Sequence, residues 1–108
     1  MSDNYLTHLE CGLCGKRHEA DQLQNLCTEC NRPLLARYDL EAAAQAISPR
    51  DLAGREPTMW RYRELLPVRA PNHELTLGEG WTPMVHAKRL GAEVGFEKLY
   101  IKDESLNP

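Results

Sequence analysis

Cysteine is absent from most of this 108-residue chain, because all four cysteines lie between residues 11 and 30. Aromatic residues are scarce as well, at 6% with a single phenylalanine, and no apolar run reaches the ~20 residues that span a bilayer. The first residues, Met-Ser-Asp-Asn-Tyr, lack the basic start and apolar core of a secretory signal. We therefore expect no membrane partner and a reducing, cytoplasmic location.

The chain also has no excess of basic residues: it contains 13 Lys and Arg and 16 Asp and Glu, for a net charge of −3. Nucleic-acid binding requires a basic face that neutralises phosphates. Basic and acidic residues are instead mixed around the cysteines, as on a solvated surface: Lys16, Arg17, Arg32 and Arg37 with Glu10, Glu19, Asp21, Glu29 and Asp39. The charge pattern argues against a nucleic-acid partner.

The four cysteines that are present have metal-ligand spacing, Cys-x2-Cys-x12-Cys-x2-Cys. Each Cys-x2-Cys pair turns two thiolates inward from one tight loop, and two facing loops complete a tetrahedral sulfur site. Gly15 and Asn31 follow the two pairs, and both residue types tolerate a left-handed backbone. The pattern predicts a zinc ribbon whose ligands are Cys11, Cys14, Cys27 and Cys30.

Other uses of the four thiols are less favoured. Two disulfides suit small secreted domains rather than a reducing compartment. Four thiolates do not exclude iron in a rubredoxin-like site, although nothing nearby indicates electron transfer. Four sulfur ligands close the coordination shell, so His8 and His18 are not needed and no position is open for catalysis. We expect a structural zinc that folds a segment too small to build its own core.

Composition divides the chain into three parts: a zinc ribbon at 1–38, a helical connector at 39–70, and a third part at 71–108. The ribbon is expected to contain three short antiparallel strands, near Leu6–Glu10, Arg17–Glu19 and Pro33–Tyr38.

The connector contains several helix caps. Asp39 is a suitable N-cap for a helix starting at Leu40. Ser48, followed by a proline and by Asp51, has the pattern of a second cap, and Gly54 is expected to end that helix. A third short helix is expected over Met59–Leu66.

The third part combines a loop, a helix and a strand. Two glycines in the loop Leu77–Pro83 permit unusual backbone angles or close approach of another group. Apolar residues over 87–94 keep helical spacing, and Gly95 follows them. The apolar run Leu99–Ile101 is typical of a strand buried on both faces, as in a parallel α/β sheet.

Such a strand requires neighbouring strands and covering helices that these residues do not supply. Asn107-Pro108 is moreover the start of a turn. We therefore expect an α+β fragment: a four-cysteine zinc ribbon, a helical connector, and the first β/α elements of a larger α/β domain.

Three stretches together resemble threonine synthases of the zinc-ribbon-bearing type, which are pyridoxal-phosphate (PLP) enzymes of the tryptophan-synthase-like fold. The stretches are the cysteine ribbon running into Pro-Leu-Leu-Ala-Arg-Tyr-Asp-Leu, the segment Met59–Pro67, and the loop Leu77–Pro83 with the run Leu99–Pro108. The last is the most specific, because in this family it continues as Asn-Pro-Thr-Gly-Ser-Phe-Lys, whose lysine carries the cofactor as a Schiff base.

The resemblance implies that the intact protein uses PLP to convert O-phosphohomoserine and water to threonine and phosphate. The lysine of the motif lies beyond Pro108, so no catalytic residue is predicted in this chain. Lys102 belongs to the Lys-Asp-Glu run that precedes the motif, and Lys16, Lys88 and Lys98 have no supporting context. We expect the 108 residues alone to form no Schiff base and to be inactive.

Six residues are candidates for lining the cofactor or substrate site of the intact protein. The strand end leads directly toward the lysine motif, and the glycine-rich loop can approach a ligand closely. The candidates are Gly78, Glu79, Gly80, Thr82, Ser105 and Asn107. Turn geometry and capping are the alternative role for each of them.

Two further interpretations stay open. Related PLP lyases that act on phosphoserine-like substrates share these N-terminal features. A stand-alone zinc-ribbon binding module is the third interpretation, in which the 108 residues are a finished zinc adaptor. As an enzyme, the intact protein is expected to bind a small phosphorylated amino acid. Its oligomeric state does not follow from the sequence.

Overall fold

The computed structural model describes residues 4–108, which form two compact units. The first contains the described residues up to Glu56 together with Trp60–Glu74, and the second contains Pro57–Met59 and Leu75–Pro108. The predicted ribbon and most of the predicted connector thus belong to one compact unit.

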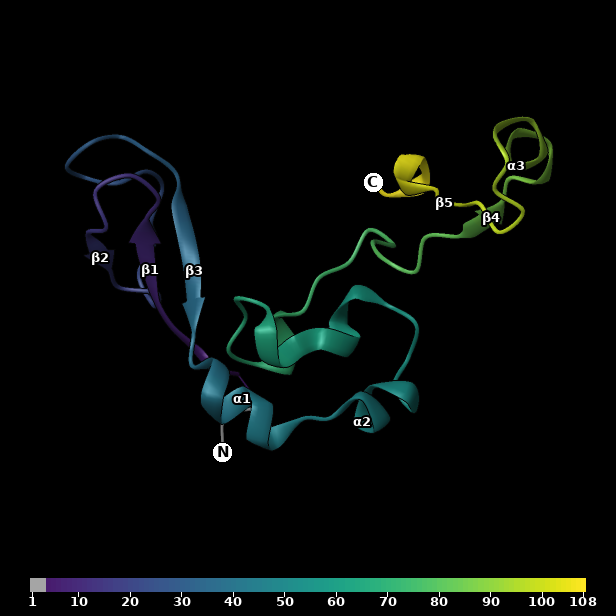
Figure 1. The fold of residues 1–108 in the computed structure, drawn as a ribbon. Helices are drawn as coiled ribbons and strands as arrows, with labels where there is room; N and C mark the ends of the chain where they lie inside the picture. Colours follow the sequence, from purple (N-terminus) through teal and green to yellow (C-terminus); the bar gives the residue numbers. More distant parts are fainter. Residues whose placement is uncertain (1–3) are drawn as a thin grey trace. The chain divides into compact units, whose positions relative to one another are not determined.

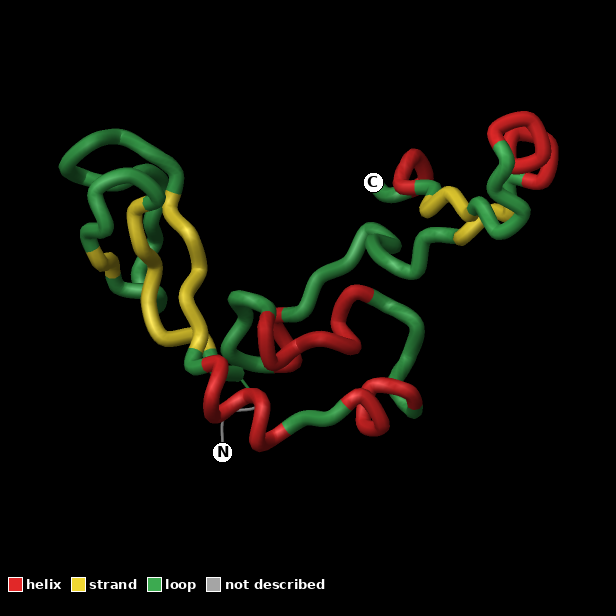
Figure 2. Tube along the Cα trace, viewed as in Figure 1, coloured by secondary structure: helices red, strands yellow, loops and turns green. Residues whose placement is uncertain are grey.

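Every helix and strand is short, and loops connect them (Figure 2). The elements up to residue 74 are β1 (Leu6–Cys11), β2 (Arg17–His18), β3 (Leu34–Tyr38), α1 (Leu40–Ala46), α2 (Pro49–Ala53) and the 3-10 helices η1 (Met59–Leu65) and η2 (Pro71–His73). The later elements are β4 (Met84–His86), α3 (Lys88–Val94), β5 (Tyr100–Lys102) and the 3-10 helix η3 (Glu104–Leu106).

The ribbon is a three-stranded antiparallel sheet with the order β2-β1-β3 (Figure 1). Leu9 of β1 lies opposite His18 of β2, and Cys11 at the end of β1 lies opposite Leu34 of β3. The three strands predicted from the sequence are confirmed.

Very little apolar surface is buried in the chain. Among the described residues, the buried apolar side chains are Leu6, Cys11, Cys27 and Ala43. Cys11 and Cys27 retain only 2% and 1% of their surface in contact with solvent. Half of this small core therefore consists of candidate metal ligands, as expected where a metal replaces a hydrophobic core.

The helix caps of the connector form as predicted. The Asp39 carboxylate accepts a hydrogen bond from the Ala42 amide at 3.0 Å and begins α1. Ser48 caps the start of α2. Its amide and hydroxyl donate to the Asp51 carboxylate at 2.7 and 2.8 Å. Gly54 ends α2.

The predicted helix Met59–Leu66 is a 3-10 segment, η1, with a non-helical backbone at Tyr62. Its carbonyls are engaged elsewhere: that of Arg61 accepts from the Arg55 guanidinium at 2.6 Å, and that of Glu64 accepts from the Tyr5 amide at 3.2 Å. These bonds to distant residues replace the regular ladder of an α-helix.

In the second unit, β4 and β5 pair antiparallel and α3 lies between them in the sequence. Helix α3 is confirmed over the predicted residues, and Gly95 ends it with a φ of +83°. Gly91 must stay small, because a Cβ there would lie 2.3 Å from the backbone oxygen of Phe96.

The strand predicted over Leu99–Ile101 forms one residue later, as β5, and within the described residues it lacks the parallel neighbours that the larger α/β domain was expected to supply. It pairs with an antiparallel rather than a parallel neighbour, and Tyr100 and Ile101 are 51% and 47% exposed. An apolar run indicates what a strand could bury, whereas its actual burial depends on neighbouring elements. The α+β class is confirmed, and the α/β domain stays a prediction.

Candidate functional site

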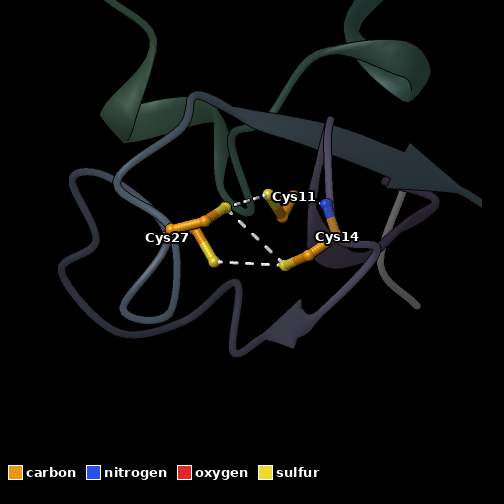
Figure 3. Close-up of side chains that lie close together, drawn as sticks. Cys11, Cys14 and Cys27 are labelled. Atoms are coloured by element: carbon orange, nitrogen blue, oxygen red, sulfur yellow. Dashed lines mark hydrogen bonds between the residues drawn. The ribbon is translucent and has the colours of Figure 1, made fainter.

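The four predicted ligands converge. Their sulfur atoms all lie within 4.8 Å of one another, and Figure 3 shows the side chains of Cys11, Cys14 and Cys27 directed toward one another. The Sγ of Cys14 lies 3.7 Å from that of Cys27 and 3.8 Å from that of Cys30. The Sγ atoms of Cys11 and Cys30 are 3.3 Å apart.

The two cysteine loops, or knuckles, have the same backbone geometry at an offset of sixteen residues. In the first knuckle (11–16) the Cys11 amide donates to the Lys16 carbonyl at 2.9 Å, and in the second (27–32) the Cys27 amide donates to the Arg32 carbonyl at 2.9 Å. Gly15 and Asn31 close them with φ angles of +75° and +55°. The left-handed backbone predicted at both positions is confirmed.

Backbone amides also point at the sulfurs. The Leu13 amide donates to the Cys11 sulfur at 3.3 Å, and the equivalent Glu29 amide donates to the Cys27 sulfur at 3.5 Å. Such bonds favour the thiolate, which is the form that binds metals.

A tetrahedral zinc fits these sulfurs. Zn–S bonds of about 2.3 Å place neighbouring sulfurs about 3.8 Å apart, which agrees with the two distances from Cys14. Four thiolates leave no open position for water, so the site suits a structural ion. The described residues thus support a zinc ribbon.

Without a cation, the thiols of Cys11, Cys14 and Cys30 oppose one another's ionisation. The Cys14 amide lowers the pKa of the Cys11 thiol to about 6, whereas the hydrogen bond with Cys11 and desolvation raise the pKa of Cys30 to about 12. The Lys16 amide lowers the pKa of Cys14, but its neighbour Cys11 and desolvation raise that pKa above its usual value. A bound dication removes this conflict, and its binding releases protons.

The six candidate lining residues lie in the second unit, in the loop before β4 and in the turn after β5. Three of them are brought into one hydrogen-bonded region. The Gly80 amide donates to the side-chain oxygen of Asn107 at 3.0 Å, and the Thr82 hydroxyl donates to Glu104 at 2.6 Å. The Lys102 ammonium donates to the Thr82 carbonyl. Hydrogen bonds therefore hold the loop before β4 against the end of β5 and the turn that follows it.

The other three candidates take part in local turns. Glu79 accepts from the Thr76 hydroxyl at 2.7 Å, and the Gly78 amide donates to that hydroxyl at 3.0 Å. The Ser105 hydroxyl and amide donate to Asp103 at 2.5 and 3.0 Å. A role for any of the six in binding stays a prediction.

Sequence reasoning missed Trp81 in the same loop. Its φ is +52°, a conformation that is unusual for an aromatic residue, and its side chain is 63% exposed. The preceding Gly80 has a φ of +85° and lies against the Met59 backbone, 3.0 Å from where a Cβ would stand. The sequence signal for an unusual backbone here was the pair of glycines before Trp81, Gly78 and Gly80.

Comparison with known proteins identifies the relatives of the chain. It is 38% identical to a threonine synthase of Methanocaldococcus jannaschii over 98 residues, which cover 91% of this chain. It is 35% identical to a threonine synthase of Methanosarcina acetivorans over 101 residues, or 94% of this chain. The resemblance to the threonine synthase family is confirmed. The chain spans about a quarter, 24%, of the length of these two threonine synthases.

Another relative has a different name. A cysteate synthase of Methanocella paludicola is 40% identical over 94 residues, which cover 86% of this chain and 19% of that protein. No family model matches the chain, and no solved structure matches it significantly. Among residues 4–108, no helix is long and apolar enough to cross a membrane.

Proposed function

We propose that this chain is the zinc-ribbon segment of a cytoplasmic, PLP-dependent threonine synthase that converts O-phosphohomoserine and water to threonine and phosphate. One observation carries the proposal: two threonine synthases match more than nine-tenths of the chain, at 38% and 35% identity. The proposed partner is a small phosphorylated amino acid, with neither nucleic acid nor membrane.

The described residues do not fit PLP by themselves. When bound, PLP supplies an electron sink for carbanions and is anchored through a lysine. Lys102 is directed at the Thr82 carbonyl, and Lys16 is held by Thr28 and Glu29 at 2.9 and 3.0 Å. We therefore derive no chemical step from these residues, and we propose that this chain alone is inactive.

Asn107 is the residue of this chain that we propose to face the ligand in the intact enzyme. Its side-chain oxygen is occupied by the Gly80 amide at 3.0 Å, which fixes the plane of the side-chain amide. The NH₂ group of Asn107 is then held as a donor at an exposed position, suited to a phosphate or carboxylate oxygen.

Steady-state kinetics of the full-length protein test this role. Asn107→Asp keeps the acceptor for Gly80 but removes the two donors and adds a negative charge. We expect a rise in KM for the phosphorylated substrate of about tenfold or more, as for the loss of a charged hydrogen bond. Asn72→Asp is the matched control, because it makes the same chemical change at an exposed residue of the other unit. Unchanged KM in Asn107→Asp would remove Asn107 from the site.

A second candidate function keeps the cofactor and changes the substrate. The similarity to a protein named cysteate synthase favours it, at 40% identity. We propose, as this alternative, a PLP lyase that acts on a phosphoserine-like substrate.

Phosphate release by the full-length, zinc- and PLP-loaded protein distinguishes the two. O-phosphohomoserine and O-phosphoserine are supplied in parallel, and threonine is quantified directly. Threonine formation from the first substrate supports our first choice. Turnover of phosphoserine alone would replace it with the second candidate.

A further inference from the structure

The four cysteine residues of the ribbon differ in their exposure to solvent. Cys11 and Cys27 are buried, with exposed fractions of 2% and 1%. Cys30 is partly exposed, and Cys14 is exposed. Of the four cysteines, Cys14 is therefore the most accessible to a reagent in solution.

One cationic side chain, that of Lys16, interacts with Cys14. The Lys16 ammonium carries a charge that interacts with the thiolates of Cys14 and Cys27. It is fixed in place by the Thr28 hydroxyl at 2.9 Å and by Glu29 at 3.0 Å. Partly exposed thiolates beside a cation are the ones that oxidants attack.

We propose that Cys14 is a redox-sensitive ligand, through which a peroxide converts the zinc ribbon into a disulfide-bonded, metal-free form. In the first step the Cys14 thiolate displaces hydroxide from hydrogen peroxide and becomes a sulfenic acid. In the second step a thiolate of the other knuckle attacks that sulfur and releases a second hydroxide, forming the S–S bond. Two thiolates are oxidised, one peroxide is reduced to two hydroxides, and Zn²⁺ loses two of its four ligands.

The sulfur distances select the partner. Cys27 and Cys30 lie 3.7 and 3.8 Å from Cys14, and each must approach to the ~2.05 Å of a disulfide. Bonding to Cys27 leaves Cys11 and Cys30, which are already 3.3 Å apart, as the second pair. The geometry therefore favours Cys14–Cys27 first. A second peroxide then oxidises Cys11 and Cys30 to the second bond, again with release of two hydroxides. Both bonds join one knuckle to the other, so they retain the connection that zinc made.

This inference concerns the ribbon alone and does not depend on the proposed enzymatic activity. The zinc-loaded chain is treated with hydrogen peroxide, zinc release is followed with a chromophoric chelator, and disulfides are mapped by mass spectrometry. We expect release of one zinc per chain, a Cys14–Cys27 bond in the first product, and recovery of zinc binding after reduction by a thiol.

Substitution of Lys16 tests the role of charge. Lys16→Gln keeps the backbone amide and is expected to slow zinc release about threefold or more, since it removes a cation next to the reacting thiolate. Lys88→Gln, in α3 of the other unit, is the matched control and is expected to release zinc at the unaltered rate.

Several outcomes would overturn the proposal. One is a first product joined within a knuckle, as Cys11–Cys14. Another is zinc release whose rate does not depend on peroxide concentration. Failure of the chain to bind zinc, or equal rates for Lys16→Gln and Lys88→Gln, would also refute it.

Discussion

The guanidinium of Arg55 meets both carboxylate oxygens of Glu64, with N–O distances of 2.8 and 2.6 Å. The Glu64 side chain is only 7% exposed and that of Arg55 is 29% exposed. The pair joins the segment after α2 to η1, and Arg55 also donates to the Arg61 carbonyl. Removing Arg55 would leave the Glu64 charge buried without this partner.

Arg55→Ala is therefore expected to lower the free energy of unfolding by about 2–4 kcal/mol, since it strands the Glu64 carboxylate. The matched control is Arg37→Ala. Arg37 pairs with Glu10 at 2.6 Å, but its side chain is 48% exposed, so its loss is expected to cost less than about 1 kcal/mol. Urea denaturation of both variants checks the ranking, and equal losses would contradict it.

The same pair predicts a dependence of stability on pH. Arg55 lowers the pKa of Glu64 below its usual value. A lowered carboxyl pKa contributes stability above the unfolded-state pKa, about 4.3, and the contribution is lost as pH falls through the folded-state value. We expect the stability gap between the native chain and Glu64→Gln to narrow as pH falls below about 4.3. A gap that is constant from pH 7 to pH 3 would exclude this linkage.

The need for glycine at position 15, where the backbone is left-handed, can be tested by comparison with Gly54. Neither Gly15 nor Gly54 has an atom within 4 Å of the position where a Cβ would stand, so a methyl group fits in both places. They differ in backbone conformation, with φ angles of +75° and −88°. Gly15→Ala is expected to cost about 1–2 kcal/mol and Gly54→Ala almost nothing. Thermal unfolding of the zinc-loaded variants measures both, and a similar Tm for the two would refute the strain argument.

Removal of zinc is expected to unfold the ribbon, because Cys11 and Cys27 make up half of the small buried apolar core. Chelation of the metal is expected to abolish amide-exchange protection in β1 and β3, and Cys11→Ser to reduce bound zinc below one ion per chain. His8→Ala provides the control: it is expected to keep one zinc, since the four sulfurs suffice. Persistent protection after chelation would show that the sheet needs no metal.

Local features were predictable from the sequence because they depend on neighbours in the chain. The caps at Asp39 and Ser48 and the left-handed Gly15 and Asn31 each follow from the residue itself and its near neighbours. The metal ligands were predictable for a related reason: the spacing of Cys11 and Cys14 brings both thiolates into one loop.

Contacts between distant segments were not predictable in this way. Arg69 donates to Asp21 at 2.8 Å although the two are 48 residues apart. Two carbonyls of η1 accept hydrogen bonds from Tyr5 and Arg55, and periodicity within the segment does not report such bonds. The exposure of β5 and the left-handed Trp81 likewise depend on what packs around them.

The sixteen-residue repeat of the knuckles has a consequence for engineering. Each loop organises its own two sulfurs, and the intervening segment supplies no ligand, although it contains β2 and Asp21, which forms an ion pair with Arg69. Leu23 in that segment is fully exposed, at 103%. An epitope tag or a fluorophore-bearing peptide grafted beside Leu23 should leave the ribbon able to assemble, which offers a convenient handle for labelling.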